Sequence, residues 1–329
     1  IRIAMHLYVL SALRMMCMPR GLASAHFRWR ESSLRLLRIE LDRLILLFVP
    51  ATLILRLALD LNPLETGGMI ARLGILVAFI IMNAQGINAW FYSGGGLQLW
   101  EEVYAPFNVI PRPQGNTGVQ MGGWFRKDMN TIDDYKGLKM RIPGLGGKVI
   151  SKAGGTVVLL PGGEIFTSLE RGVIDATEWV GPMHDLRMGF YKAAKNYYYP
   201  GWHEPGTCLE VMFNKKAYES LPVELQQIVD AVAAETNMWS LCEFEAGNGA
   251  ALQTLISEHN VNLVRFPDQL MEDLRKLANE TLEEEANKDP MSRKVHDAFL
   301  KFKAQVGVWG SVSENAYYNV IADKYALKK

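Results

Sequence analysis

Between residues 119 and 213 the sequence alternates between short apolar runs and helical segments of about ten residues. Alternation of this kind is typical of βαβ units, in which helices connect neighbouring strands of a mostly parallel sheet. The order therefore predicts an α/β fold. Strands are expected at 119–125, 138–142, 156–160, 173–180, 197–199 and 209–213, and helices at 131–136, 147–153, 163–170 and 182–195.

The pattern changes after residue 213, where apolar residues recur at helical spacing over long stretches. We expect helices at 223–260, 267–287 and 293–306, with one further strand at 261–266. The last two helices are amphipathic and charged on the outside, so the acidic run at 283–285 is interpreted as a solvated face.

The first 82 residues differ in composition from the rest of the chain. They hold ten Arg, no Lys and five acidic residues, a net +5, whereas the remainder has 25 basic and 30 acidic residues, a net −5. This stretch is either an irregular helical segment or the product of a shifted reading frame upstream of residue 83, which the Lys-free composition favours. Its apolar run at 44–55 is too short for the roughly 20 residues that cross a membrane.

Several functional classes are excluded by charge and motif. The net charge is zero, so nothing predicts a nucleic-acid surface. Cys17, Cys208 and Cys242 form no C-x-x-C pair, and we expect unpaired thiols. The glycine-rich segment at 144–148 lacks the first Gly and the Ser or Thr of a phosphate loop. His203-Glu204 begins like a zinc-protease pair, but the helix it needs is broken by a proline.

Three charged residues lie in or just after apolar strands. Arg141 stands between Met140 and Ile142, and its planar guanidinium is suited either to an external carboxylate or to an internal salt bridge. Glu178 and Glu204 both end apolar aromatic strands. If they share one cleft, a hard cation between them relieves the repulsion. Two unrelated carboxylates and acid–base catalysis are the alternatives that the residues leave open.

The segments that hold these residues resemble the solute receptors of TRAP transporters, in particular the branch that binds 2-oxo acids and related monocarboxylates. The resemblance covers residues 83–329 and is strongest at 118–206. It rests on the runs WFYSGGGL, GVQMGGWF, GLKMRIPG, LLPGGE, IDATEWVGP and YYYPGWHE.

The resemblance implies an α/β, two-lobed periplasmic-binding-protein fold, type II-like, with long C-terminal helices. Lobe two is expected at 120–205, lobe one and the C-terminal helices at 83–119 and 206–329, and an atypical segment at 1–82. Arg141 would clamp the substrate carboxylate, and Gln120, Glu178 and Trp179 would also bind the substrate. A sodium or calcium ion that bridges substrate and protein would be held by Gln120, Glu178, the backbone carbonyl of Trp179, and Glu204.

The implied function is that of a periplasmic receptor, not an enzyme, that delivers a small 2-oxo or 2-hydroxy acid to TRAP membrane subunits. A homodimer is one expected assembly, and nucleic acid is not an expected partner. Because the chain starts at Ile1 without an ordered leader pattern, we expect the natural start and its signal sequence to lie upstream. Two alternatives are a metal-dependent enzyme that acts on a small carboxylate and a non-functional product of a disrupted gene.

Overall fold

The computed structural model describes residues 82–321. The expectations for the atypical segment at 1–82, including its apolar run and Cys17, lie outside the described residues except at residue 82. Of the described residues, 82–220 and 228–321 belong to one compact unit, which holds the sheets and cores below. No described helix is long and apolar enough to cross a membrane. Cys208 is buried and Cys242 is exposed, and both are free, as expected.

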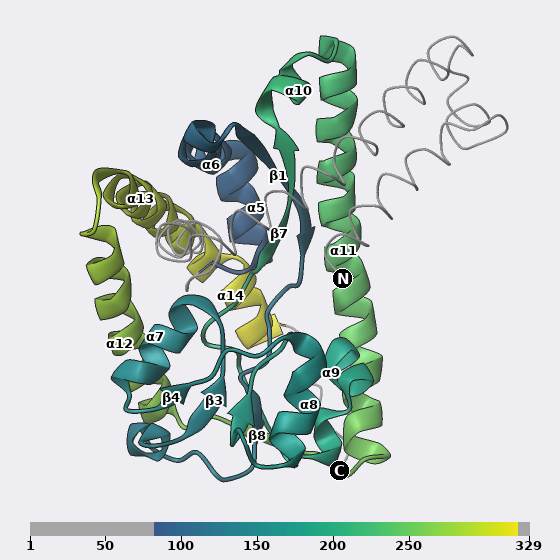
Figure 1. The fold of residues 1–329 in the computed structure, drawn as a ribbon, viewed down its shortest axis with the longest axis vertical. Helices are drawn as coiled ribbons and strands as arrows, with labels where there is room; N and C mark the ends of the chain where they lie inside the picture. Colours follow the sequence, from purple (N-terminus) through teal and green to yellow (C-terminus); the bar gives the residue numbers. More distant parts are fainter. Residues whose placement is uncertain (1–81, 322–329) are drawn as a thin grey trace, which may run out of the picture. The chain divides into compact units, whose positions relative to one another are not determined.

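A six-stranded sheet, in the lower part of Figure 1, has the strand order β4-β3-β5-β2-β6-β8. Three of its five pairings are parallel, but β2 runs antiparallel to both of its neighbours. The sheet is therefore less parallel than predicted. The sequence could not show the direction of β2, because a buried strand has the same apolar pattern in either direction. The strands are β2 (Gly123–Phe125), β3 (Lys139–Arg141), β4 (Thr156–Val157), β5 (Ala176–Thr177), β6 (Asn196–Tyr199) and β8 (Asn262–Arg265).

Helices cover both faces of this sheet. On one face, α7 (Gly144–Lys152) and α12 (Asp268–Ala286) contribute to one apolar core. On the other, α8 (Gly162–Glu170) and the end of α11 (Val223–Ser257) contribute to a second core. Figure 1 shows α7 and α12 on the side of the sheet away from α8. The two central strands, β2 and β5, are buried throughout, as expected for strands covered on both faces.

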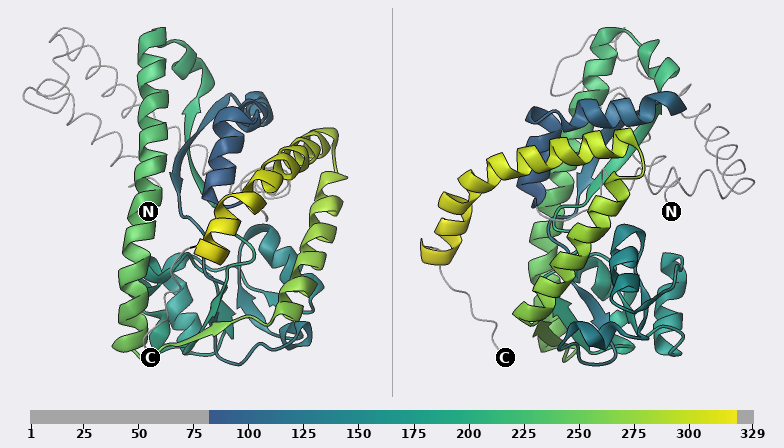
Figure 2. Two further views of the ribbon diagram at one scale, coloured as in Figure 1. Left: turned by 180° about the vertical axis from the view of Figure 1, so that it is seen from behind. Right: turned by 90° about the vertical axis from the view of Figure 1, so that its left-hand side faces the viewer.

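A smaller antiparallel sheet pairs β1 (Val109–Asn116) with β7 (Cys208–Asn214). A third apolar core lies beside it, between α5 (Ala84–Ser93), α6 (Gly96–Tyr104) and α13 (Pro290–Val312). The views in Figure 2 show α13 running from the end of α12 towards α5 and α6. Strand β1 was not predicted, because its two prolines argue against a central strand. In a two-stranded sheet both strands are edges, where proline is tolerated.

Local signals set several boundaries. The expected helix start at Thr131 is confirmed as a reciprocal capping box with Asp134, ahead of a 3₁₀ turn. The helix expected at 182–195 ends early, because Gly189 adopts a left-handed conformation (φ 75°) that terminates α9 (Pro182–Met188). The remaining short elements are η1 (Ala105–Phe107), η2 (Ile132–Tyr135), η3 (Phe190–Lys192), α10 (Lys215–Glu219), α14 (Glu314–Ala316) and η4 (Tyr317–Ile321).

Candidate functional site

Arg141 is the last residue of β3, and its side chain lies against the end of β5. The parallel register pairs Arg141 with Thr177, the last residue of β5, so Glu178, which follows the strand, comes within reach. The Nη1 atom of Arg141 donates to Glu178 Oε1 at 2.6 Å and to the Glu178 carbonyl at 3.2 Å. Its guanidinium lies over the ring of Trp179, 5.2 Å from the centroid. The internal salt bridge left open by the sequence therefore forms.

Glu178 is also in contact with the segment that follows β6. Its Oε2 lies 3.2 Å from Nε2 of His203, and both side chains are 2% exposed. Glu178, His203 and Glu204 each offer one atom that could coordinate a metal ion, and these atoms lie within 4.8 Å of one another. The two glutamates predicted to share a cleft therefore meet, and a buried histidine joins them.

Gln120 lies beside this cluster because its backbone crosses that of residues 201–204 at close range. Its N–H donates to the carbonyl of Glu204, and its carbonyl accepts from Gly201 N–H at 2.9 Å. Any side chain at Gly201 would overlap the Gln120 carbonyl, so a glycine is required there. The amide nitrogen of Gln120 donates to Thr117 and to Thr207, whose hydroxyl donates to Glu204 at 2.9 Å. The Oε1 atom of Gln120 is buried and has no partner among the described residues.

The electrostatics of this cluster favour protons or cations. Burial raises the pKa of Glu204, and the negative charge of Glu178 raises it further. Burial alone would lower the pKa of His203, but the hydrogen bond and charge of Glu178, with the charge of Glu204, outweigh burial and raise that pKa. The cluster therefore holds more negative charge than Arg141 alone neutralises.

The donor set fits a hard cation. Two carboxylates and the unpartnered amide oxygen of Gln120 are the oxygen ligands that sodium- and calcium-type ions take. The carbonyl oxygen of Trp179 accepts no hydrogen bond from the described residues, so it too is available as a ligand. His203 is less suited to such an ion, because imidazole nitrogen is a ligand of softer metals.

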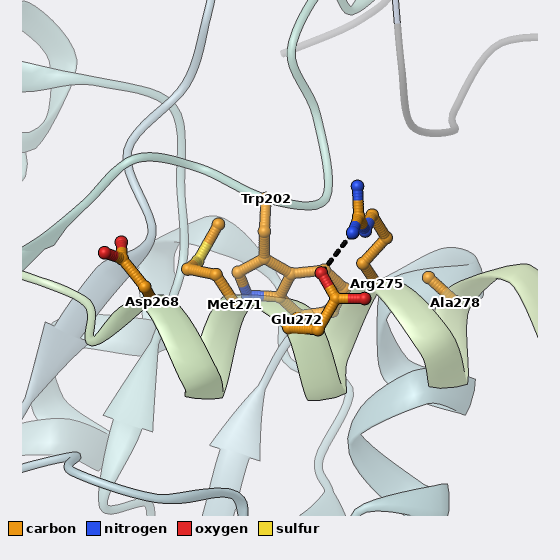
Figure 3. Close-up of a pocket in the computed structure, with 6 residues that line it drawn as sticks. All are labelled: Trp202, Asp268, Met271, Glu272, Arg275 and Ala278. Carbon is orange, nitrogen blue, oxygen red and sulfur yellow. Dashed lines mark hydrogen bonds and ion pairs between the residues drawn. The ribbon is translucent and has the colours of Figure 1, made fainter.

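A pocket of about 280 Å³ lies elsewhere, along α12 (Figure 3). Two of its charged residues, Glu272 and Arg275, pair with each other. It contains no member of the Arg141–Glu178 cluster, and only Trp202 is adjacent to that cluster in sequence. We therefore place the functional site at the charged cluster and not at this pocket. The pocket is lined by Trp202, Asp268, Met271, Glu272, Arg275 and Ala278.

Comparison with known families accounts for most of the described chain. The family described as bacterial extracellular solute-binding protein, family 7 (DctP), matches residues 69–289. The chain belongs to this family. The matched range begins 14 residues before the start of the resemblance at residue 83. A second profile, the mechanosensitive ion channel inner membrane domain 1, matches residues 1–96. The two matched ranges overlap at residues 69–96, which include the change from the Lys-free segment to the rest of the chain. A shifted reading frame upstream of residue 83 stays a prediction.

Relatives within the family are close. A monocarboxylate 2-oxoacid-binding periplasmic protein of Nostoc is 46% identical over 238 residues, which are 72% of this chain and 65% of the relative. The chain thus spans less than two thirds of that relative's length.

Solved family structures confirm the predicted fold. A TRAP periplasmic solute-binding protein from Colwellia psychrerythraea, with bound calcium and pyruvate, has a TM-score of 0.71 at 45% identity and 74% coverage of both chains. One from Pseudoalteromonas atlantica, with bound sodium and pyruvate, has a TM-score of 0.71 at 44% identity, covering 75% of this chain and 74% of its own. A third, from Bordetella bronchiseptica, is a dimer with calcium and picolinate (TM-score 0.73, 38% identity, coverage 75% and 74%).

The structure brings together all five residues that the sequence analysis selected. Arg141, Glu178 and Trp179 contact one another directly, and Gln120 joins Glu204 through Thr207. Their roles as ligands stay predictions. His203 was missed as a member of the site, because its pairing with Glu204 was tested only as a protease motif. A histidine beside an acidic residue, at the end of an aromatic strand, was the signal that could have identified it.

Proposed function

We propose that this chain is the periplasmic solute receptor of a TRAP transporter and binds a small 2-oxo or 2-hydroxy monocarboxylate together with a bridging sodium or calcium ion. The observation that carries the proposal is the buried cluster in which one arginine, two glutamates and an unpartnered amide oxygen meet at strand ends. Pyruvate bound with calcium or sodium in family structures 44–45% identical to this chain supports it.

Each residue has a distinct part in this function. Arg141 offers a planar, charged donor to the carboxylate of the ligand. Gln120, Glu178, the Trp179 carbonyl and Glu204 hold the ion, which supplies positive charge that neutralises the paired carboxylates and links them to the ligand. The indole of Trp179 lies against the guanidinium and limits the size of the ligand.

We propose that the two sheets mark the two lobes of the receptor, which close on the ligand before delivery to the membrane subunits. The division at 120–205 remains a proposal; strand β8 adds to the sheet of that segment. A homodimer is proposed to form through the apolar side chains exposed on α13 and its continuation, in keeping with the dimer of the Bordetella relative. These exposed residues are Val308, Trp309, Val312, Tyr317, Tyr318 and Val320.

Titration calorimetry with pyruvate tests the proposal. We expect binding in calcium or sodium buffer and a large loss of affinity after chelation in sodium-free buffer. Arg141→Lys should weaken binding by more than about tenfold, because the two-pronged donor is lost. Arg126→Lys is the matched control, since the side chain of Arg126 donates, among the described residues, to the Leu169 carbonyl alone, and the affinity for pyruvate should not change. Undiminished affinity of Arg141→Lys contradicts the assignment.

The enzyme alternative has its own readout. We propose that the receptor releases its ligand unchanged, so proton NMR of pyruvate with stoichiometric protein and calcium should show no product over a day. Steady conversion of pyruvate would support the metal-dependent enzyme instead.

A further inference from the structure

The Arg141–Glu178 ion pair joins two groups that the proposed function assigns to different ligands, the carboxylate for Arg141 and the cation for Glu178. This inference rests on that proposed function and concerns how the site is regulated. The pair is short, 2.6 Å, and its side chains are 12% and 2% exposed. It therefore lies in an environment where solvent weakens the attraction little.

We propose that this ion pair is an internal latch, in which the Glu178 carboxylate occupies the place of the substrate carboxylate on Arg141 until Glu178 is drawn away. An intramolecular carboxylate competes strongly, because it is always present at high effective concentration. A free monocarboxylate must displace it to use the Nη1 side of the guanidinium. The latch thus lowers the affinity of the receptor for the carboxylate when no cation is bound.

The contacts around Glu178 show that both of its oxygens are engaged. Oε1 accepts from Arg141, and Oε2 lies 3.2 Å from His203. Each oxygen has a second lone pair, so a cation can take either as a ligand, and its charge then weakens the attraction between Glu178 and Arg141. His203 offers it a second buried partner, so Glu178 can leave Arg141 without losing all of its hydrogen bonds.

Apart from Nη1, the guanidinium nitrogens of Arg141 make few hydrogen bonds. Its Nε lies 3.5 Å from the Leu160 carbonyl, at the limit of a hydrogen bond, and among residues 82–321 no acceptor bonds Nη2. Release of Glu178 would leave Nη1 and Nη2 as a pair of donors with the geometry of a carboxylate. The same movement that frees Glu178 therefore completes the carboxylate site.

Linkage makes this relation reciprocal. If cation binding, by drawing Glu178 from Arg141, strengthens carboxylate binding by some factor, carboxylate binding strengthens cation binding by the same factor. Couplings of this kind are typically about 5- to 150-fold. The receptor would therefore load both ligands together and release both together.

The test measures pyruvate affinity by calorimetry in chelated, sodium-free buffer, where the latch is closed in the wild type. Glu178→Gln weakens the ion pair and keeps the volume, so cation-free affinity should rise by about 5-fold or more over the wild type. Glu285→Gln is the control: Glu285 is a buried glutamate like Glu178, but it pairs with Lys148 and Lys288 outside the site. Its cation-free affinity should stay within about twofold of the wild type.

A second variant tests whether the contact of residue 178 with Arg141, and not its charge alone, limits carboxylate binding. Glu178→Asp retains the charge but shortens the side chain, so it also should raise cation-free affinity. If neither substitution at Glu178 strengthens cation-free binding, or if Glu285→Gln strengthens it equally, the latch is refuted while calcium-dependent binding by the wild type still upholds the proposed function. If the wild type binds no carboxylate even with calcium, the proposed function fails, and the latch fails with it.

Discussion

The buried carboxylate of Asp185 should make the stability of this protein depend on pH. Asp185 lies in α9 and is 1% exposed. It accepts hydrogen bonds from Trp124 Nε1 at 2.9 Å, Tyr197 Oη at 2.8 Å and the Val180 amide at 3.3 Å. Burial raises the pKa of Asp185 from 3.8 to about 7; these hydrogen bonds lower it and the charge of Glu178 raises it.

The sign of the effect follows from the raised pKa. The folded protein holds this proton more tightly than the unfolded chain, so protonation stabilises the fold. That stabilisation is complete below about pH 4 and is lost as the pH rises to about 7. At roughly 1.4 kcal/mol for each pH unit, the loss amounts to about 4 kcal/mol as an upper estimate.

Urea unfolding from pH 4.5 to 8.5 measures this dependence. Asp185→Asn cannot ionise, so the free energy of unfolding of the wild type should fall relative to that of the variant as the pH rises, by a few kcal/mol in all. Asp133→Asn, at a side chain that is 70% exposed, is the control and should parallel the wild type. If the curves for Asp185→Asn and the wild type stay parallel over this range, the pKa of Asp185 is not raised and the reasoning is wrong.

Two further predictions use matched positions within the chain. A Cβ at Gly162 would lie 2.7 Å from the ring of Trp179, whereas one at Gly163 meets nothing within 4 Å. Gly162→Ala should therefore displace the indole and weaken pyruvate binding about tenfold, and Gly163→Ala should not; equal calorimetric affinities would contradict this. A thiol reagent should label the exposed Cys242 in the native protein but Cys208, buried and with a raised pKa, only after unfolding, as peptide mass mapping would show. Rapid native labelling of Cys208 would disprove its burial.

Much of the local structure was predictable from sequence, because its causes lie within a few residues. The capping box at Thr131 is formed by a side chain and a backbone only three residues apart. The strand that carries Arg141 was evident from its apolar neighbours, and the resemblance of short segments pointed to the two glutamates.

Tertiary structure alone decided how these residues meet. The ion pair of Arg141 depends on the register of β3 against β5, which places Glu178 beside the guanidinium across 37 residues of chain. The place of His203 depends on the crossing of Gly201 over the Gln120 carbonyl. The antiparallel course of β2 was equally hidden from the sequence. Register and strand direction are set by packing between distant segments, and a pattern of apolar residues records that a strand is buried but not which strand lies beside it.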